Sequence, residues 1–552
     1  MDDLARRLAV ARGDEPADVV VRGGRVLSVF TREWLDVDIA IADGHIAGLG
    51  TYDGQEVIDA SSRYIVPGFI DAHMHLESTK LLPDEFARLV LPRGTTAVVL
   101  DPHELANVLG TDGVHWLLDA CEGLPLDFYF MASSSIPASA FESPRRPLLS
   151  GDLESLLRRR RVLGLAEMMN FPGVINGDPA ELQKLELAEG VHVDGHAPGV
   201  HGRALNAYVA SGIRSDHEAL TEEEGRERLR SGMWLLIREA SMARNLQALL
   251  PLVKEFGTSR IAFCTDDRDP EDIAENGHIN GMVREAVAAG VPPEDAIVLA
   301  TINPATWHRL WHLGAVAPGY QADLLVLSDL DRFEPELTLK RGRVVGEIPK
   351  TEVPEWVKHS VRNSPVTADD FRVPPPSGKV RVIGLVPDQV VTELLEEEPS
   401  TELAKIAVVE RHLGTGRIGR GFVRGSGLRR GALASTVSHD AHNIIVTGMT
   451  EDDMAHAVTR LGELGGGIVV VDGGTVTAEL PLPVAGLLAD APLAEVISKS
   501  LACNDAARAL GWSGATPFLT LSFLGLSVIP SLKITDRGLV DVDRFEIVPL
   551  EI

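Results

Sequence analysis

The stretch Pro67-Gly68-Phe69-Ile70-Asp71-Ala72-His73-Met74-His75-Leu76-Glu77 decides the fold of this chain. A Pro-Gly pair precedes a short apolar run, and charged or ionisable groups gather where the run ends, which is typical of a buried strand. Because side chains alternate across a strand, the spacing of His73 and His75 places both imidazoles on one side. This pair alone could hold one metal ion.

Four further potential ligands each follow a short apolar run: Glu167, His196, His217 and Asp266. Taken singly, the glutamate could be a salt-bridged carboxylate, either histidine a satisfied core residue, and Asp266 a helix N-cap. If the runs are parallel barrel strands, however, their carboxyl ends converge on one face. A mixed imidazole and carboxylate set suits divalent zinc, manganese or iron. We therefore predict a binuclear hydrolytic site.

The region from residue 67 to residue 313 alternates strand-like runs with helix-like segments such as 179–189 and 222–231. Such alternation is typical of a parallel sheet with crossover helices. Eight runs can be counted, ending near His73, Asp101, Ser133, Glu167, His196, His217, Glu239 and Asp266. The count favours an α/β fold of the (β/α)8 TIM-barrel type over an open doubly wound sheet, and no Gly-x-Gly-x-x-Gly turn opens the first helix.

The flanks of this region have a different texture. Residues 1–66 and 314–350 contain alternating runs broken at glycine turns, which predicts a small β-sandwich domain built from both flanks. The proline-rich segment 351–379 reads as a connection. Residues 380–552 are expected to form a C-terminal α+β domain, with a strand at 468–471 and helices at 451–464 and 493–510.

Composition and charge narrow the function. The formal net charge of −28 disfavours nucleic acid as a partner, so a small-molecule substrate is expected. Only three widely separated cysteines occur, which fits a reducing cytoplasm rather than a disulfide framework. The first residues carry charge where a secretory signal would be apolar. The most apolar late segment, 518–532, is short for a bilayer span of roughly 20 residues, so no membrane role is expected.

Two polar clusters lie outside the ligand set. Asp101-Pro102-His103-Glu104 ends the second run and is interpreted as a substrate-facing loop. Ser438-His439-Asp440-Ala441-His442-Asn443 fits a solvated loop before a strand and a contribution to an active site equally well.

Longer motifs carry a family resemblance. The stretch 67–75 resembles the first-strand signature of the amidohydrolase superfamily, and the stretch 319–324 resembles its return into the small β domain. A finer resemblance, to bacterial adenine deaminases, extends over nearly the whole chain. It rests on the segments 75–78, 91–96, 101–108, 195–199, 215–218, 243–246, 265–267 and 438–443.

The resemblance implies hydrolytic deamination of adenine to hypoxanthine and ammonia in purine salvage, by a metal-bridged hydroxide. It implies two divalent ions, manganese or iron before zinc, held by His73, His75, Glu167, His196, His217 and Asp266. Glu167 stands where many relatives carry a carboxylated lysine, so an unmodified acidic bridge is expected. A homo-oligomer, such as a dimer, is also expected.

The remaining site residues are assigned as a hypothesis of mechanism. Asp266 is expected to shuttle a proton, and Glu77 or His103 to protonate a ring nitrogen. The residues expected to bind substrate are Asp101, Glu104, Arg238, His439, Asp440 and His442.

Two other functions stay open at this point. One is an amidohydrolase that acts on a cyclic amide or a modified purine, because ring opening and deamination begin with the same attack on an sp2 carbon. The other is a non-catalytic, purine-binding relative. A cytidine-type zinc deaminase is excluded, because the chain lacks the Pro-Cys-x-x-Cys motif.

Overall fold

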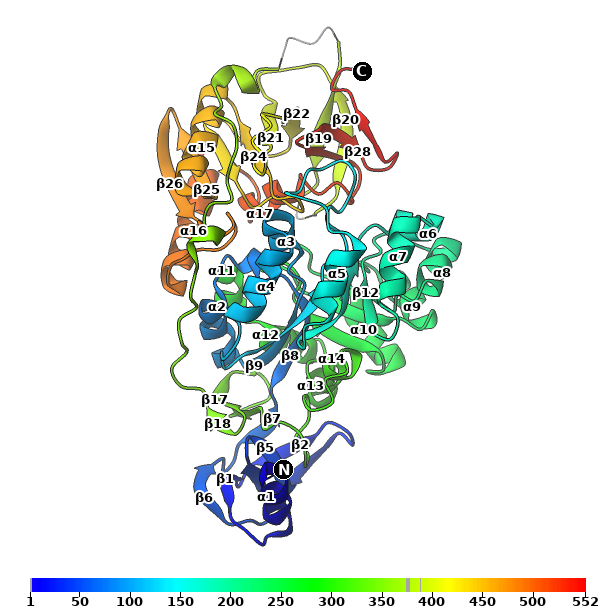
Figure 1. Cartoon of the computed structure of the whole chain (residues 1–552), viewed down its shortest axis with the longest axis vertical. Helices are drawn as coiled ribbons and strands as arrows, with labels where there is room; N and C mark the ends of the chain where they lie inside the picture. Colours follow the sequence, from blue (N-terminus) through cyan, green and yellow to red (C-terminus); the bar gives the residue numbers. More distant parts are fainter. Residues whose placement is uncertain (1, 374–377, 388) are drawn as a thin grey trace.

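The computed structural model describes residues 2–373, 378–387 and 389–552. Figure 1 shows three regions along the long axis: a small β region at the N-terminal end, a central region of strands ringed by helices, and a C-terminal region at the far end. The proline run 374–376 of the expected connection lies outside the described residues.

The eight runs expected in the central region all form strands. They are β8 (Phe69–Met74), β9 (Thr95–Leu100), β10 (Asp127–Ala132), β11 (Val162–Met168), β12 (His192–Gly195), β13 (Ser215–Asp216), β14 (Trp234–Arg238) and β15 (Ile261–Cys264). These strands are rich in Val, Ile, Leu and Ala and are buried on both faces, as parallel strands covered by helices must be.

The barrel closes between its first and last strands. Strands β8 to β12 form one parallel sheet and β13 to β15 another. A parallel bridge joins Met74 to Asp266, and the Asp266 N–H donates to the carbonyl oxygen of His73 at 3.0 Å. The prediction of a (β/α)8 barrel is confirmed, and the carboxyl ends of its strands therefore meet on one face.

Helices cover the outside of the barrel (Figure 1). They are α2 (Pro83–Val90), α3 (His103–Leu109), α4 (Thr111–Ala120), α5 (Ser150–Leu157), α6 (Phe171–Asn176), α7 (Pro179–Leu187), α8 (Gly202–Ala210), α9 (Glu222–Arg230), α10 (Leu246–Phe256), α11 (Pro270–Asn276), α12 (Ile279–Ala288), α13 (Pro293–Leu299) and α14 (Ile302–Trp307). Helix α9 begins with a capping box, in which Thr221 accepts from the Glu224 N–H and Glu224 accepts from the Thr221 N–H. A long loop, residues 133–149, separates β10 from α5.

Strands from both flanks of the barrel share one sheet. Its order is β18-β17-β16-β7-β2-β3, and a second sheet, β5-β4-β1-β6, packs against it. The strands are β1 (Ala17–Arg22), β2 (Arg25–Ser28), β3 (Glu33–Asp36), β4 (Ile39–Ala42), β5 (His45–Leu49), β6 (Gly54–Asp59), β7 (Tyr64–Pro67), β16 (Leu324–Leu327), β17 (Pro335–Lys340) and β18 (Arg343–Val344). Helix α1 (Asp2–Arg12) precedes them.

The C-terminal region is built on an eight-stranded sheet in the order β20-β19-β22-β21-β24-β23-β25-β26. Its strands are β19 (Val380–Leu385), β20 (Thr392–Glu397), β21 (Ala404–Val409), β22 (Ile418–Arg424), β23 (Ala432–Ser435), β24 (Ile444–Gly448), β25 (Gly467–Asp472) and β26 (Thr475–Pro481). A smaller sheet and three helices complete it: β27 (Leu532–Thr535), β28 (Gly538–Asp541), β29 (Glu546–Val548), α15 (Glu451–Leu464), α16 (Leu493–Ala509) and α17 (Pro517–Phe523).

Helix α17 and the segment that follows it face the barrel (Figure 1). Leu519, Phe523 and Leu526 pack there against Ala138 of the β10–α5 loop and Met169 beside β11. Across the described part of the chain, no helix combines the length and apolar character that crossing a bilayer requires.

Candidate active site

The six proposed metal ligands converge at the carboxyl ends of the barrel strands. His73 lies on β8, His75 directly follows it, and Glu167 lies on β11. His196, His217 and Asp266 follow the ends of β12, β13 and β15, and all six side chains are buried. Residues spread over some 190 positions are thereby brought to one point, as strand geometry predicts.

Glu167 lies at the centre of the cluster. One carboxylate oxygen, Oε1, lies 3.3 Å from Nε2 of His75 and 3.8 Å from Nε2 of His73. The other, Oε2, lies 2.8 Å from Nδ1 of His196 and 3.3 Å from Nε2 of His217. Among the proposed ligands, each oxygen therefore faces its own pair of imidazoles, which is the placement that a bridge between two cations would require.

Asp266 lies beside the first pair. Its Oδ1 lies 3.1 Å from Nε2 of His75 and 3.6 Å from Nε2 of His73. The backbone of Asp266 has a φ of 59°, a left-handed conformation that aspartate tolerates better than most residues. Its N–H bond to the carbonyl of His73 fixes this turn, so its carboxylate is aimed at the histidine pair.

Arg238 controls the charge of Asp266. Its Nη1 donates to Oδ2 of Asp266 at 2.7 Å, and its guanidinium also forms a two-point ion pair with Glu218. Burial raises the pKa of Asp266, but the Arg238 charge and the two imidazoles outweigh burial and hold that pKa well below its usual value. Asp266 is therefore ionised at neutral pH and can accept a proton.

The cluster fits divalent cations. Nε2 of His73 and Nε2 of His196 are buried, yet neither makes a hydrogen bond within the part of the chain that the structure describes. Buried polar atoms without partners are costly, and imidazole nitrogens gathered around carboxylates are ordinary ligands of zinc, manganese and iron. The residues present thus suit a binuclear divalent metal centre.

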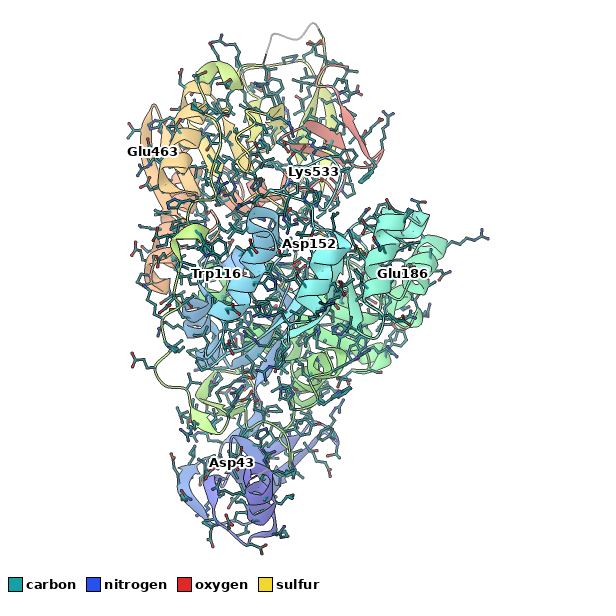
Figure 2. The ribbon with its side chains drawn as sticks, viewed as in Figure 1. Asp43, Trp116, Asp152, Glu186, Glu463 and Lys533 are labelled. Carbon is teal, nitrogen blue, oxygen red and sulfur yellow. The ribbon has the colours of Figure 1, made fainter. Side chains whose placement is uncertain are left out.

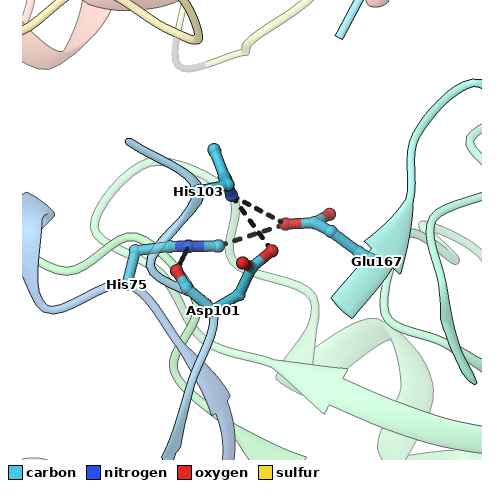
Figure 3. Close-up of side chains that lie close together, drawn as sticks. All are labelled: His75, Asp101, His103 and Glu167. Carbon is cyan, nitrogen blue, oxygen red and sulfur yellow. Dashed lines mark hydrogen bonds and ion pairs between the residues drawn. The ribbon is translucent and has the colours of Figure 1, made fainter. Parts of the chain in front are cut away.

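His103 extends the cluster toward the C-terminal region (Figure 3). Its Nδ1 lies 3.1 Å from Oδ2 of Asp101 and 3.6 Å from Oε1 of Glu167. The carbonyl of Asp101 also accepts from Nδ1 of His75 at 3.0 Å. Burial lowers the pKa of His103, but Asp101 and Asp440 raise it well above the ordinary value. His103 can therefore carry the proton that a general acid needs.

A pocket opens over the cluster, and its walls come from two parts of the chain. The barrel supplies one wall, which includes His75, His103, Glu167, His196, His217, Glu218, Arg238, Asp266 and Asp267. The C-terminal region supplies the facing wall, made of Val390, His439, Asp440, Phe523, Leu526 and Ile529. The cavity combines the ionisable groups of the His/Asp/Glu cluster with an apolar cover, as small-molecule sites commonly do.

The segment 438–443 lines this pocket with only some of its residues. His439 and Asp440 line it, and Oδ1 of Asp440 lies 3.4 Å from both Nδ1 of His439 and Nε2 of His103. His442 lies one layer behind, where its Nδ1 accepts from the Ser438 N–H at 3.0 Å. Because Nδ1 is an acceptor, Nε2 must carry the proton, and it faces Glu104 at 3.4 Å.

Glu77 and Glu104, two of the expected site residues, also lie behind the wall. Glu77 accepts from the backbone N–H of Leu105 in α3 at 3.0 Å, and burial together with Glu104 raises the pKa of Glu77 to about 8. Glu104 accepts from Ser78 at 3.1 Å. Arg238 and His103 lie in the wall itself, whereas Asp101 supports His103 from outside it.

Sequence reasoning missed part of the wall. Glu218, Val390, Phe523, Leu526 and Ile529 all contact the cavity, and none was expected there. One signal was present: residues 518–532 form the most apolar late segment of the sequence, and a contiguous apolar segment is often buried against another part of the fold.

Two protein-family models match the two regions of the chain that line this pocket. The Amidohydrolase family model matches residues 64–345, and the Adenine deaminase C-terminal domain matches residues 385–546. Adenine deaminase 2 of Carboxydothermus hydrogenoformans is 45% identical over 570 residues, covering 100% of both chains. Adenine deaminase of Brucella suis biovar 1 is 47% identical over 551 residues, covering 97% of this chain and 95% of that one.

The chain belongs to the adenine deaminase family of the amidohydrolase superfamily.

Both regions that match a family model contribute residues to the pocket. The amidohydrolase part of the chain contains all six members of the ligand cluster, and the superfamily carries a divalent metal centre. The part matched by the adenine deaminase C-terminal domain contains every C-terminal residue named in the facing wall. Among solved structures, molinate hydrolase aligns with a TM-score of 0.43 and 17% identity, covering 60% of this chain and 95% of that one.

Proposed function

We propose that this chain hydrolyses adenine to hypoxanthine and ammonia and so serves purine salvage. One feature of the molecule carries the proposal: the wall over the metal cluster is supplied by the region that matches the adenine deaminase C-terminal domain. Relatives that match the whole chain are named adenine deaminases, which supports the same activity.

We propose that His73, His75, Glu167, His196, His217 and Asp266 hold two divalent cations, manganese or iron in the cell, with zinc also compatible. Bound there, the cations supply a water-derived nucleophile at neutral pH, because coordination lowers the pKa of water toward neutrality. Glu167 separates the two histidine pairs and needs no covalent modification to do so.

Asp266 is proposed to move the proton. Its carboxylate accepts a proton from the attacking water and delivers it to the amine that leaves C6 of adenine. The ion pair with Arg238 supports this role, because it keeps the carboxylate ionised and fixed in orientation. The proton is thereby kept inside a closed site.

His103 is the proposed acid for the purine ring. Protonation of a ring nitrogen relieves the negative charge that develops when a nucleophile adds to C6. Its Nδ1 contact with Asp101 holds the imidazole so that Nε2 faces Asp440 and the pocket. Glu77, the alternative acid, lies behind α3 and is proposed to act through the position of that helix.

Arg238, His439 and Asp440 are proposed to contact adenine or the groups that orient it, because they line the cavity. Asp101, Glu104 and His442 are proposed to support them from the layer behind.

We also propose a cytoplasmic protein, in line with its three free buried cysteines, and a homo-oligomeric state. The proposed division is 1–66 with 314–350, 67–313, a connection at 351–379, and 380–552. The sheet shared by β7 and β16 supports joining the two flanks in one domain.

The test is production of hypoxanthine and ammonia from adenine by purified protein. The protein is stripped of metal and reconstituted anaerobically with Mn²⁺, Fe²⁺ or Zn²⁺, and bound metal is measured by mass spectrometry. We expect both products in equal amounts, dependent on about two ions per chain. A fully loaded protein that yields neither product would refute adenine deamination.

A further inference from the structure

One buried carboxylate in the β10–α5 loop contacts two of the C-terminal segments that line the pocket. The Glu142 side chain is buried, and its Oε1 accepts from the Ser139 N–H at 3.2 Å and from the Ser527 hydroxyl at 3.0 Å. Its Oε2 accepts from the Ala441 N–H at 3.1 Å. Glu142 thus links its own loop to two segments that are remote in sequence.

Each of these partners lies beside residues of the pocket wall. Ala441 directly follows His439 and Asp440, which supply the polar part of the wall. Ser527 lies between Leu526 and Ile529, which supply its apolar part. The Ser527 hydroxyl also lies 2.6 Å from that of Ser139, so a second bond parallels the one to Glu142.

We propose that Glu142 is a positioning residue that sets the C-terminal wall of the pocket, and with it the affinity for the substrate. This inference rests on the proposed function. Glu142 acts through the backbone of Ala441, which orients His439 and Asp440, and through Ser527, which holds the apolar cover. It touches neither the substrate nor the metal cluster.

The chemistry of the side chain suits this task. A carboxylate offers two acceptor oxygens, and three donors converge on Glu142. Alanine would leave the buried N–H of Ala441 without its acceptor. An unmet buried donor is costly enough to shift the loop that carries it.

A neighbouring contact provides a matched control. Ser143 lies in the same loop and also joins it to the C-terminal region, because its hydroxyl accepts from Arg417 at 2.9 Å and from Arg537 at 3.2 Å. Those two arginines lie outside the lining residues of the pocket. Replacing Ser143 therefore weakens the same junction and spares the wall.

The experiment compares Glu142→Ala, Glu142→Gln and Ser143→Ala with the wild type. We expect Glu142→Ala to raise KM for adenine about tenfold, with kcat within about threefold and metal content unchanged. Glu142→Gln keeps one acceptor oxygen, so its KM should lie between that of Glu142→Ala and that of the wild type. Ser143→Ala should leave KM within about twofold of wild type. Equal changes in Glu142→Ala and Ser143→Ala, or an unchanged KM in Glu142→Ala, would overturn the proposal.

Two further measurements separate positioning from loss of folding. In calorimetry, the affinity of metal-loaded Glu142→Ala for hypoxanthine should fall about tenfold, while its melting transition stays cooperative. If Glu142→Ala does not fold, Glu142→Gln is used instead, and its affinity should fall by a smaller factor. In an Asp440→Asn background, Glu142→Ala should raise KM by a smaller factor than it does in the wild-type background, because both changes disturb the same loop. Additive losses would argue against the proposal. Absence of adenine turnover in the wild type would instead refute the proposed function, which keeps the two failures distinct.

Discussion

The ring of Phe523 stacks on the imidazole of His439, with centroids 4.8 Å apart and an interplanar angle of 16°. Both side chains line the pocket, so the stack forms part of the wall that faces the metal cluster. His439 is further held by Asp440 on the side of His103. An aromatic residue at the end of α17 therefore orients a polar group of the candidate site.

Loss of this stack should weaken substrate binding. Aromatic stacking contributes roughly 0.5–1.5 kcal/mol beyond area burial, so Phe523→Leu should lower kcat/KM for adenine about threefold to tenfold. Steady-state kinetics of the metal-loaded variant measure the effect. Phe518→Leu, on the same helix but outside the pocket lining, is the control and should leave kcat/KM near wild type. Equal losses in both variants would assign the effect to helix packing.

Asp266→Asn should separate metal binding from proton transfer. The amide keeps an oxygen beside His73 and His75 but cannot take up a proton, and a positioned acid or base contributes typically 10²–10⁴-fold. We expect kcat to fall by about a thousandfold, with a substantial part of the metal retained. Metal analysis and single-turnover kinetics on the same preparation provide the readout. Turnover near the wild-type rate would exclude Asp266 as the proton shuttle.

Removal of the central carboxylate should act on the metals first. Because Glu167 faces the four imidazoles of the proposed ligand set, Glu167→Ala should reduce bound metal to about one ion per chain or fewer and abolish turnover. Mass spectrometry after dialysis measures the stoichiometry. Glu181→Ala is the control, since this buried glutamate pairs with Lys184 away from the site. Two tightly held ions in Glu167→Ala would contradict the bridging position.

Lys533 gives stability a characteristic dependence on pH. Lys533 lies in the C-terminal region and is labelled in Figure 2. Its buried ammonium donates to the carbonyls of Val390 at 2.7 Å and Phe523 at 3.0 Å. Burial lowers the pKa of Lys533 to about 7, whereas an unfolded lysine titrates near about 10.4. Between these values the unfolded chain binds more protons, so this group makes stability rise with pH.

Lys533→Met should remove that dependence. The penalty for a buried charge is fully present below pH 7 and disappears by about pH 10, so the Tm of the variant relative to wild type should fall as pH rises from 6 to 10. A relative change of roughly 10 °C is expected, because lowering the lysine pKa from about 10.4 to about 7 is worth about 4 kcal/mol over this pH range. About 1 kcal/mol shifts Tm by 2–4 °C in domains of 150–250 residues. Differential scanning fluorimetry at several pH values measures it, with Lys499→Met as the exposed control. Parallel curves for Lys533→Met and wild type would refute the shifted pKa.

The barrel could be predicted because its signals are local. A run such as Phe69–Met74 is apolar because both faces of a barrel strand are covered. The proposed ligands Glu167 and Asp266 lie at or just beyond the ends of such runs. Helices were placed within one or two residues: 222–231 was expected and α9 spans Glu222–Arg230. The capping residue Thr221 marks that start in the sequence itself.

The C-terminal wall could not be predicted in the same way. Phe523 and Val390 line the same wall but come from segments that share no periodicity, and packing between distant segments leaves no repeat in the sequence. Glu142 lies in a loop, where a carboxylate is ordinarily solvated, so only its burial reveals its contacts. The motif 438–443 is recognisable in the sequence, but which of its histidines faces the cavity depends on the fold.

The two walls also differ in their order along the chain. Asp266, the last of the six proposed ligands, precedes Val390, the first C-terminal residue of the facing wall. Because translation proceeds from the N-terminus to the C-terminus, the ribosome adds all six proposed ligands before any C-terminal residue of the facing wall. A nascent chain therefore contains the whole proposed ligand set at a stage when the C-terminal cover of the pocket has not yet been synthesised.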